Sequence, residues 1–512
     1  LTAYGSLANF SEKVAIHIND THPALVIPEL MRILLDTYSY GWDDAWRLVT
    51  STVSYTNHTV MPEALETWNE ELFRFKLPRI YNIVNEINRR FCADLWTAYP
   101  GDWDRISRMS IIGYNQIRMA NLSVVGSHTV NGVSKLHSEI LKKTIFHDFY
   151  KYTPEKFTNV TNGIALRRWL CYSNPQLSAL IDECIGDKWH KQSELLADFA
   201  KFSNDASVLE RVEKIKRANK SNFAIYAESR TGVRLDPDSI FDVQIKRMHE
   251  YKRQLLNALR IISLYNTLRE NPDADIQPQT FIFGAKAAPG YYMAKKIIKL
   301  ICYIGAQIEK EPKIREKLRV LFMEDYNVSL AEVLIPASDI SEQISLAGKE
   351  ASGTSCMKFM ANGALTIGTM DGANVEIFDQ VGDSNIYIFG LTTEEVDDLW
   401  RRGYNATQYY IQSERLRAAV DAFDVGFNNQ SFTDIKQYLV NPQYAHGIAD
   451  PYMCLADFES YLNTHDAMTR DWRDREKWNR MSLFNIAKSG YFSADRAIRE
   501  YADNIWHLRS IK

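Results

Sequence analysis

Strand-like and helix-like segments alternate regularly between residues 239 and 389, and this alternation constrains the fold more than any other feature of the chain. Strands alternating with helices indicate a parallel sheet covered by helices on both faces. Ligands in such sheets bind at the carboxyl ends of the strands. The expected strands are 240–245, 280–283, 319–323, 364–368 and 386–389, and the expected helices are 253–269 and 289–310, with another opened by the loop at 353–363.

The chain has 512 residues, well beyond the length at which one hydrophobic core usually splits into two, so two α/β lobes are expected. Residues 1–165 form the later part of a helix-rich N-terminal lobe, and residues 166–512 form a Rossmann-like C-terminal lobe whose last helices, within 471–511, cap the fold. Since Leu1-Thr2 is neither an initiator Met nor a signal peptide, we expect the chain to begin inside a domain. In the first lobe we predict helices at 28–40, 62–75 and 82–95 and strands at 14–18 and 122–125.

Composition excludes several classes of partner. The net charge is −4, which gives no reason to expect nucleic acid or an anionic membrane. No apolar run is long enough to span a bilayer. The six cysteines form no CxxC pair, which favours reduced thiols in a cytoplasmic protein. No metal-binding spacing such as HExxH occurs, so no metal site is predicted.

A loop of small and hydroxyl residues leads into a lysine. Residues 350–358 read Glu-Ala-Ser-Gly-Thr-Ser-Cys-Met-Lys. Backbone N–H groups of such a loop can point at a phosphate, and Lys358 follows within one turn. Beside apolar Met357 and Phe359, the amine can have the lowered pKa that Schiff-base chemistry requires. An ordinary Gly/Ser turn with a solvated lysine explains the same pattern equally well.

A basic cluster follows the first expected strand. Residues 246–253 read Lys-Arg-Met-His-Glu-Tyr-Lys-Arg, four cations at an expected helix N-terminus, where the helix dipole disfavours them. Fixed anions, such as two phosphates, would offset both the dipole and the mutual repulsion. The alternative is a solvated basic helix end with Glu250 as a local partner.

Two further features are compatible with a site. Asp371-Gly372 is a turn signal after the strand at 364–368, and a structural turn is its simpler interpretation. Polar clusters at 19–23 and 55–59 offer the neutral donors and acceptors that a sugar needs, although a lone histidine such as His58 is more often a satisfied core residue.

Residues 350–376 closely resemble the pyridoxal phosphate signature of the α-glucan phosphorylases, which act on glycogen, starch or maltodextrin. Segments 19–32, 55–66, 132–143, 161–169, 246–257 and 326–332 are also similar to that family, so the resemblance covers essentially the whole chain. It corresponds to the C-terminal portion of a family member. It implies a two-lobed glycosyltransferase (GT-B-like) fold with Rossmann-like sheets, an incomplete first lobe and an active site in the cleft between the lobes.

The resemblance also implies roles for individual residues. Lys358 would form a Schiff base with pyridoxal 5'-phosphate. Cofactor contacts would come from Gly353, Thr354, Ser355, Tyr326, Trp169 and Lys246. Catalytic contacts with the substrate phosphate would come from Arg247 and Lys252, together with Lys246. Contacts with the glucosyl unit would come from Glu350, Ser352, Gly353, Asn162, His58 and Tyr251.

Three positions depart from the family pattern: Ser355-Cys356 stand where the family has Gly-Asn, and Asn327 follows Tyr326 where the animal enzymes have Arg, which removes one cation near the site. Ser355 stands where the family has Gly, which leaves phosphate binding intact if its φ is negative and strains it if φ is positive.

The implied reaction transfers the terminal α-1,4-linked glucosyl unit of a glucan to inorganic phosphate with retention, giving glucose 1-phosphate. The resemblance also implies a cytoplasmic homodimer that acts in glycogen metabolism as an allosteric enzyme. One rival is a nucleotide-sugar glucosyltransferase of the same fold, because Glu342 and Glu350 have the E-x7-E spacing of such enzymes. The other is a non-catalytic glucan-binding fragment.

Overall fold

The structure is a computed structural model that describes residues 7, 9–444 and 447–508. The chain divides into two compact units. Unit 1 comprises Leu1–Asn162 and Ala497–Lys512, and unit 2 comprises Gly163–Arg496. Within the described residues, no helix is both long and apolar enough to cross a membrane. The predictions for residues 1–6 and 509–511 lie outside the described part.

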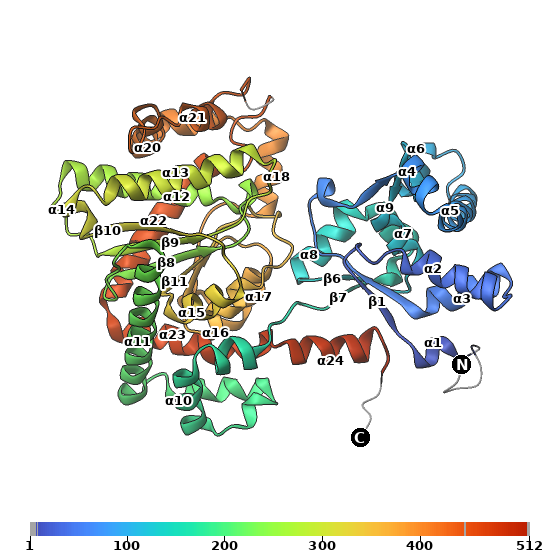
Figure 1. Ribbon diagram of the computed structural model, residues 1–512, viewed down its shortest axis with the longest axis horizontal. Coiled ribbons are helices and arrows are strands. Elements are labelled where there is room, and N and C mark those ends of the chain that lie inside the picture. Colours follow the sequence, from blue (N-terminus) through green and yellow to red (C-terminus); the bar gives the residue numbers. More distant parts are fainter. Residues whose placement is uncertain (1–6, 8, 445–446, 509–512) are drawn as a thin grey trace. The chain divides into compact units, whose positions relative to one another are not determined.

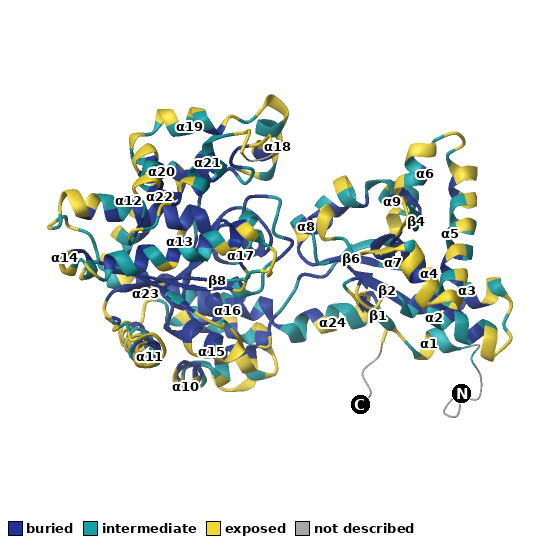
Figure 2. Ribbon diagram, turned by 45° about the horizontal axis from the view of Figure 1, so that its top comes forward, coloured by how far each residue is buried: buried dark blue, intermediate teal, exposed yellow. Residues whose placement is uncertain are grey.

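Unit 2 is built on a six-stranded sheet in which every neighbouring pair is parallel (Figure 1). Its strand order is β10-β9-β8-β11-β12-β13. Most of its strands are almost continuously apolar, as expected when helices cover both faces, and β8 is buried along its whole length (Figure 2). The strands are β8 (Ile240–Ile245), β9 (Gln279–Gly284), β10 (Leu318–Met323), β11 (Ile340–Gln343), β12 (Leu365–Gly368) and β13 (Tyr387–Ile388).

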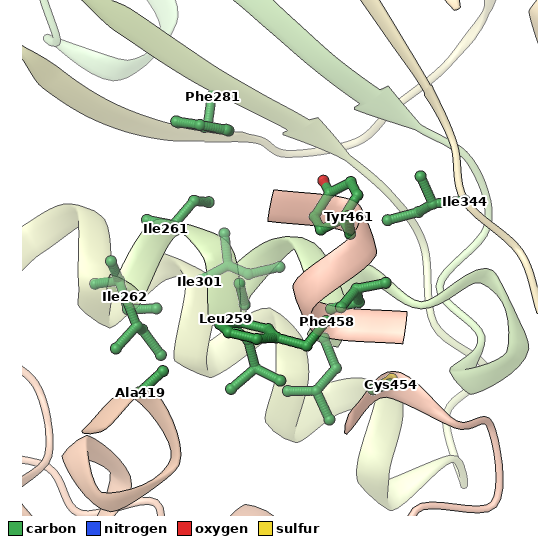
Figure 3. Close-up of a cluster of buried hydrophobic side chains, with 14 of the residues drawn as sticks. Leu259, Ile261, Ile262, Phe281, Ile301, Ile344, Ala419, Cys454, Phe458 and Tyr461 are labelled. Atoms are coloured by element: carbon green, nitrogen blue, oxygen red, sulfur yellow. The ribbon is translucent and has the colours of Figure 1, made fainter. Parts of the chain in front are cut away.

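Alternate strand residues face two separate hydrophobic cores. Phe281 faces a core shared with α12, α13, α20 and α22, while Ile282 faces one shared with α11, α15, α16 and α17. Figure 3 shows part of the first core, where Leu259 of α12 packs with Phe458 and Tyr461 of α22. These helices are α11 (Ala206–Thr231), α12 (Gln254–Glu270), α13 (Tyr292–Ile308), α15 (Val328–Ala337), α16 (Ser355–Ala361), α17 (Ala373–Val381), α20 (Glu414–Val425) and α22 (Cys454–Arg473).

Further helices complete unit 2. They are α10 (Pro175–Ile185), α14 (Pro312–Arg315), α18 (Thr393–Arg402), α19 (Ala406–Gln412), α21 (Thr433–Val440) and α23 (Arg475–Lys488). The predicted alternation of strands and helices is confirmed, and the doubly covered parallel sheet with it. One strand was missed: β11 reads Ile-Ser-Glu-Gln, so it lacks an apolar run, yet it lies between β8 and β12.

Unit 1 contains a four-stranded parallel sheet in the order β1-β2-β6-β7 and a three-stranded antiparallel sheet. The parallel strands are β1 (Ile16–Asn19), β2 (Val53–Thr56), β6 (Val130–Gly132) and β7 (Phe157–Asn159), and the antiparallel strands are β3 (Thr67–Asn69), β4 (Ile112–Gly113) and β5 (Gln116–Arg118). The helices are α1 (Phe10–Lys13), α2 (Val26–Arg32), α3 (Trp42–Thr52), α4 (Glu70–Lys76), α5 (Pro78–Ala98), α6 (Trp103–Met109), α7 (Met119–Gly126), α8 (Lys135–Ile140) and α9 (His147–Tyr152). After unit 2, α24 (Ala494–Asn504) returns the chain to unit 1.

Two predictions for unit 1 were wrong. The apolar run at 122–125 is part of α7, because a short apolar run has the same composition in a buried helix and in a strand. The expected helix at 62–75 is interrupted by β3, and only Glu70–Lys76 is α-helical there. The helix predicted at 82–95 is confirmed within α5.

A cluster of ionisable side chains lies buried where β8, β11 and α22 meet. The ligand atoms of Asp242, Glu342 and His465 all lie within 4.8 Å of one another. Glu342 Oε1 accepts hydrogen bonds from Tyr461 Oη at 2.9 Å and from His465 Nε2 at 2.7 Å. Burial and the neighbouring Asp242 raise the pKa of Glu342 well above its ordinary value. The folded state therefore favours the protonated form of this carboxyl group more than the unfolded chain does.

Replacing Glu342 with glutamine is expected to stabilise the protein at alkaline pH. The folded state keeps a proton on Glu342 that the unfolded chain releases above its ordinary pKa, so stability falls as pH rises through that interval. Glutamine keeps the acceptor for Tyr461 and His465 without that linkage. We expect a gain of about 1 kcal/mol at pH 8 and almost none near pH 4.5, measured by urea unfolding. An exposed control, Glu316→Gln, should change neither value. A loss of stability at pH 8 would show that Glu342 is ionised.

Candidate active site

The basic cluster lies at the carboxyl end of β8, where ligands bind in open parallel sheets. Residues 246–249 are irregular, Glu250–Lys252 form one turn of 3-10 helix, and α12 begins at Gln254. The cations therefore precede the long helix rather than occupying its first turn, which lowers the dipole penalty that the sequence suggested.

Lys252 is paired with a carboxylate almost 100 residues away. Its Nζ lies 2.6 Å from Glu350 Oε2, and the two side chains are 13% and 18% exposed. Burial lowers the pKa of Lys252, but Glu350 and Tyr251 outweigh that effect, so the pKa is raised. Burial raises the pKa of Glu350, but Lys252 and Lys246 outweigh it, so the net pKa is lowered. Both groups are charged at neutral pH.

Lys246 is held by a neutral amide instead. Its Nζ donates to Gln343 Oε1 at 2.9 Å, and Gln343 Nε2 donates to Ser355 Oγ at 3.2 Å. Burial lowers the pKa of Lys246 to about 8, an effect opposed by Glu350 and reinforced by Lys252. Among the described residues no carboxylate forms an ion pair with this cation, which titrates near pH 8.

The sequence predicted that bound phosphates neutralise all four cations, and this prediction was only partly right. Arg253 lies in a buried ion pair with Asp457, and Lys252 is paired with Glu350. Arg247 is exposed. Protein carboxylates thus offset two of the cations, and Lys246 and Arg247 are the two for which a bound anion would supply the balance. The alternative partner, Glu250, instead accepts a hydrogen bond from Tyr291 Oη.

Lys358 lies on α16 against an aromatic ring. Its Nζ is 4.0 Å from the ring centre of Trp169, which belongs to the helical segment Arg167–Tyr172. Burial lowers the pKa of the Lys358 amine. The neighbouring Met357 and Phe359 are fully buried, as the sequence indicated. A solvated surface lysine is therefore the wrong interpretation.

The loop before α16 combines a glycine in the left-handed region with a helix start. Gly353 has a φ of +82°, a conformation that favours glycine, and its O accepts from Cys356 Sγ at 3.4 Å. Thr354 precedes the helix with a φ of −118°, and Ser355 is the first residue of α16. Ser355 is not among the residues with positive φ, so the substitution of Ser for Gly introduces no backbone strain.

The Asp371-Gly372 turn supports this loop from behind. Asp371 Oδ2 accepts from the backbone N of Glu350 at 2.8 Å and of Lys349 at 3.2 Å. Gly372 has a φ of +51°, and a Cβ there would lie 2.4 Å from Ser352 O. The predicted structural turn is confirmed. Its role is to hold Glu350 and Ser352 in place.

The two tyrosines and the serine of the prediction also lie around these strand ends. Tyr326 packs on Gly284, where a Cβ would lie 3.2 Å from the tyrosine ring, and Gly284 O accepts from Lys246 N at 3.1 Å. Tyr251 O accepts from Leu346 N at 3.0 Å. Ser352 is buried beside Gly353. In unit 2, Lys246, Tyr251, Lys252 and Tyr326 therefore lie near the carboxyl ends of β8, β9 and β10, while Lys358 and Trp169 contact each other at α16.

The remaining predicted residues, His58 and Asn162, belong to unit 1. His58 Nε2 lies 2.6 Å from Asn19 Oδ1, which joins the two polar clusters of the sequence at the ends of β1 and β2. Burial lowers the pKa of His58. Asn162 N donates to Val133 O at 3.0 Å. Their contacts with a glucosyl unit stay predictions.

Sequence reasoning missed three residues of the site. Gln343 links Lys246 to Ser355, Ser345 Oγ donates to Glu350 Oε2 at 3.0 Å, and Arg253 fixes the turn that follows Lys252. The signal that could have found the first two is their position at the carboxyl end of β11, but that strand was itself missed.

The fold and site together define a class of protein: an α/β unit that carries a lysine of lowered pKa and a group of cations at the carboxyl end of a parallel sheet. The particular family follows from comparison with known proteins. Residues 2–508 match the model of the carbohydrate phosphorylase family, and the chain belongs to that family.

Its curated relatives include three glycogen phosphorylases. The enzyme of Bacillus subtilis (strain 168) is 50% identical over 505 residues, covering 98% of this chain and 63% of that protein. The muscle form of Oryctolagus cuniculus is 49% identical, covering 97% and 59% respectively. The enzyme of Synechocystis sp. is 47% identical, covering 99% and 60%. The chain thus spans about three-fifths of the length of these relatives.

Proposed function

We propose that this chain carries the cofactor-binding and phosphate-binding part of an α-glucan phosphorylase. The reaction transfers the terminal α-1,4-linked glucosyl unit of a glucan to inorganic phosphate with retention and gives glucose 1-phosphate. One observation carries the proposal: Lys246 and Lys252 follow β8, and Gln343 links Lys246 to Ser355, the first residue of the helix that carries Lys358. Lys252 is paired with Glu350, Lys246 forms no ion pair with a carboxylate among the described residues, and Lys358 lies on an aromatic ring with a lowered pKa.

The residues present fit pyridoxal 5'-phosphate as the cofactor. A lysine whose pKa is lowered by burial suits attachment of an aldehyde, and the Trp169 ring beside Lys358 Nζ supplies a flat apolar wall. The backbone of Gly353, Thr354 and Ser355, with Lys246 nearby, would hold the phosphate, and Tyr326 would close the site. When bound, the cofactor supplies a second phosphate, whose ionisation at a pKa of about 6 suits proton exchange at neutral pH.

The chain's own residues position the substrate phosphate and stabilise charge. Lys252, fixed by Glu350, and the exposed Arg247 would bind the phosphate oxygens, where cations also stabilise charge as the glycosidic bond breaks. Glu350, Ser352, Gly353 and Tyr251 would contact the glucosyl unit. Glu350 is paired with Lys252, which disfavours its use as one of the two carboxylates of a glycoside hydrolase.

The rival nucleotide-sugar transferase is disfavoured by Glu342. Its carboxyl group is 0% exposed and bound by Tyr461 and His465 within the core. Glu342 and Glu350 therefore do not act on one ligand, despite their E-x7-E spacing. The cytoplasmic location and homodimeric assembly predicted from the family belong to the same proposal.

The function is tested by incubating the purified chain, loaded with pyridoxal phosphate, with maltoheptaose and inorganic phosphate. We expect glucose 1-phosphate as the product and no transfer from UDP-glucose or ADP-glucose in parallel reactions. Glucosyl transfer from a nucleotide sugar would establish the rival. Glucan binding without product from either donor would establish the non-catalytic fragment.

Anion binding at this site is expected to weaken as pH rises through about 8. Below that pH Lys246 is protonated, and above it the cation is lost because its folded pKa is about 8. Sulfate is a suitable probe because its own charge is constant in this range. We expect its affinity, measured by isothermal titration calorimetry, to fall about tenfold between pH 7 and pH 9. Lys246→Met should bind weakly at both pH values; if it retains the pH dependence, another group titrates.

A further inference from the structure

Arg253 combines three features that an ordinary helix-start residue lacks. It has a φ of +55°, the left-handed region that disfavours side chains other than glycine. Its side chain is completely buried. It directly follows Lys252, whose ammonium forms the ion pair with Glu350. A strained, buried and charged residue persists only when the surrounding structure determines it strongly.

The guanidinium group joins several loops at the strand ends. Its Nη1 donates to Asp457 Oδ2 at 2.7 Å, and its Nε donates to Ile344 O at 2.7 Å. Asp457 in turn accepts from Leu391 N at 3.0 Å, after β13. Gly390 lies against the same carboxylate, where a Cβ would come within 2.6 Å of Oδ2. Arg253 therefore ties the turn after β8 to the loops after β11 and β13 and to α22.

These contacts form a closed ring that includes Lys252, a residue of the proposed phosphate site. Lys252 is bonded through the chain to Arg253, which donates to Ile344 O. The next residue, Ser345, donates from Oγ to Glu350 Oε2 at 3.0 Å. Glu350 Oε2 completes the ring at Lys252 Nζ, 2.6 Å away. Arg253 thus lies next to both donors to Glu350 Oε2. Lys252 precedes it in the chain, and Ser345 follows Ile344, whose O accepts from Arg253.

We propose that Arg253, with Asp457, is a positioning residue that sets Lys252 for binding the substrate phosphate. The inference rests on the proposed function for the identity of the ligand. The side chain of Arg253 is too deeply buried to touch a substrate, so its effect acts through Lys252. The planar guanidinium is required because one charged group must reach a carboxylate and a carbonyl oxygen in different directions, which a lysine ammonium on a flexible stem does poorly.

The test compares Arg253→Lys with Asp457→Asn and with a matched control, Arg217→Lys. Arg217 also pairs with an aspartate: it donates twice to Asp238, at 2.8 and 2.9 Å, on the exposed surface of the same unit. For the first two variants we expect the KM for phosphate to rise about tenfold, the KM for maltoheptaose to change less than about twofold, and kcat to stay within about threefold. The control should match the unsubstituted chain.

The Kd of inorganic phosphate, measured by calorimetry without turnover, gives a second readout. It should rise about tenfold in both variants, with circular dichroism like that of the unsubstituted chain. If the unsubstituted chain binds phosphate but forms no glucose 1-phosphate, the proposed function fails while this comparison still decides the role of Arg253. An unchanged phosphate Kd in either folded variant, or equal losses for both substrates, would overturn the proposal. If Arg253→Lys does not fold, Asp457→Asn decides alone.

Discussion

Replacing Lys358 with alanine is expected to lower the rate of glucose 1-phosphate formation at least about a thousandfold. The amine at this position lies 4.0 Å from the Trp169 ring centre, and burial lowers its pKa. No side-chain atom of alanine could hold an aldehyde there. The loss should appear in kcat, measured at saturating phosphate and glucan with pyridoxal phosphate in excess.

The control for this experiment is Lys286→Ala. Lys286 is an exposed lysine of the same unit, paired with Asp325 at 2.9 Å, and its removal should leave the rate unchanged. The mutant at 358 should remain folded, since its side chain makes no hydrogen bond or ion pair within the described residues. A Lys358→Ala protein that keeps more than a tenth of the activity would contradict the assigned role.

Replacing Lys252 with methionine is expected to change both activity and stability strongly. It is expected to lower phosphorolysis about a thousandfold and to destabilise the fold by about 3–5 kcal/mol, because it leaves the buried Glu350 carboxylate without its cation. Because Lys252 lowers the pKa of Glu350, its removal raises that pKa. At acidic pH Glu350 then binds a proton and loses its charge, so part of the stability should return. Activity assays and urea unfolding measure the two consequences.

The double variant Lys252→Met/Glu350→Gln separates stability from function. In this variant neither residue of the former ion pair carries a charge, and Ser345 Oγ can still donate to the oxygen of the glutamine amide. We expect stability near that of the unsubstituted chain and no recovery of activity. Recovery of both together would mean that the lysine acts only by neutralising Glu350 and does not bind phosphate.

Local patterns predicted the elements of unit 2 well because its strands are apolar and bounded by clear helices. The strand prediction at 240–245 coincides with β8, and the helix prediction at 253–269 differs from α12 by one residue at each end. β11 was missed because its Ser341, Glu342 and Gln343 are polar. Their burial depends on partners such as Tyr461 and His465, which lie more than 100 residues away.

In the candidate site, too, features of the local sequence could be predicted, but contacts between distant residues could not. The loop at 350–358 and the basic run at 246–253 were visible as motifs, because their chemistry is local. Which cation faces which anion was not visible. Arg247 and Arg253 are alike in the sequence, yet one is exposed and the other is completely buried against Asp457. The pairing of Lys252 with Glu350 likewise depends on how β8 and β11 are joined in the sheet.

The central claim, that Lys358 carries pyridoxal phosphate, is tested most directly by borohydride reduction followed by peptide mapping. The purified chain is incubated with the cofactor, reduced, digested and analysed by mass spectrometry, with Lys358→Ala as the control. We predict one pyridoxyl group, on the peptide that contains Lys358, and none on the control. A chain that shows no adduct at Lys358 after added cofactor, or that carries the group on another lysine, would contradict the account.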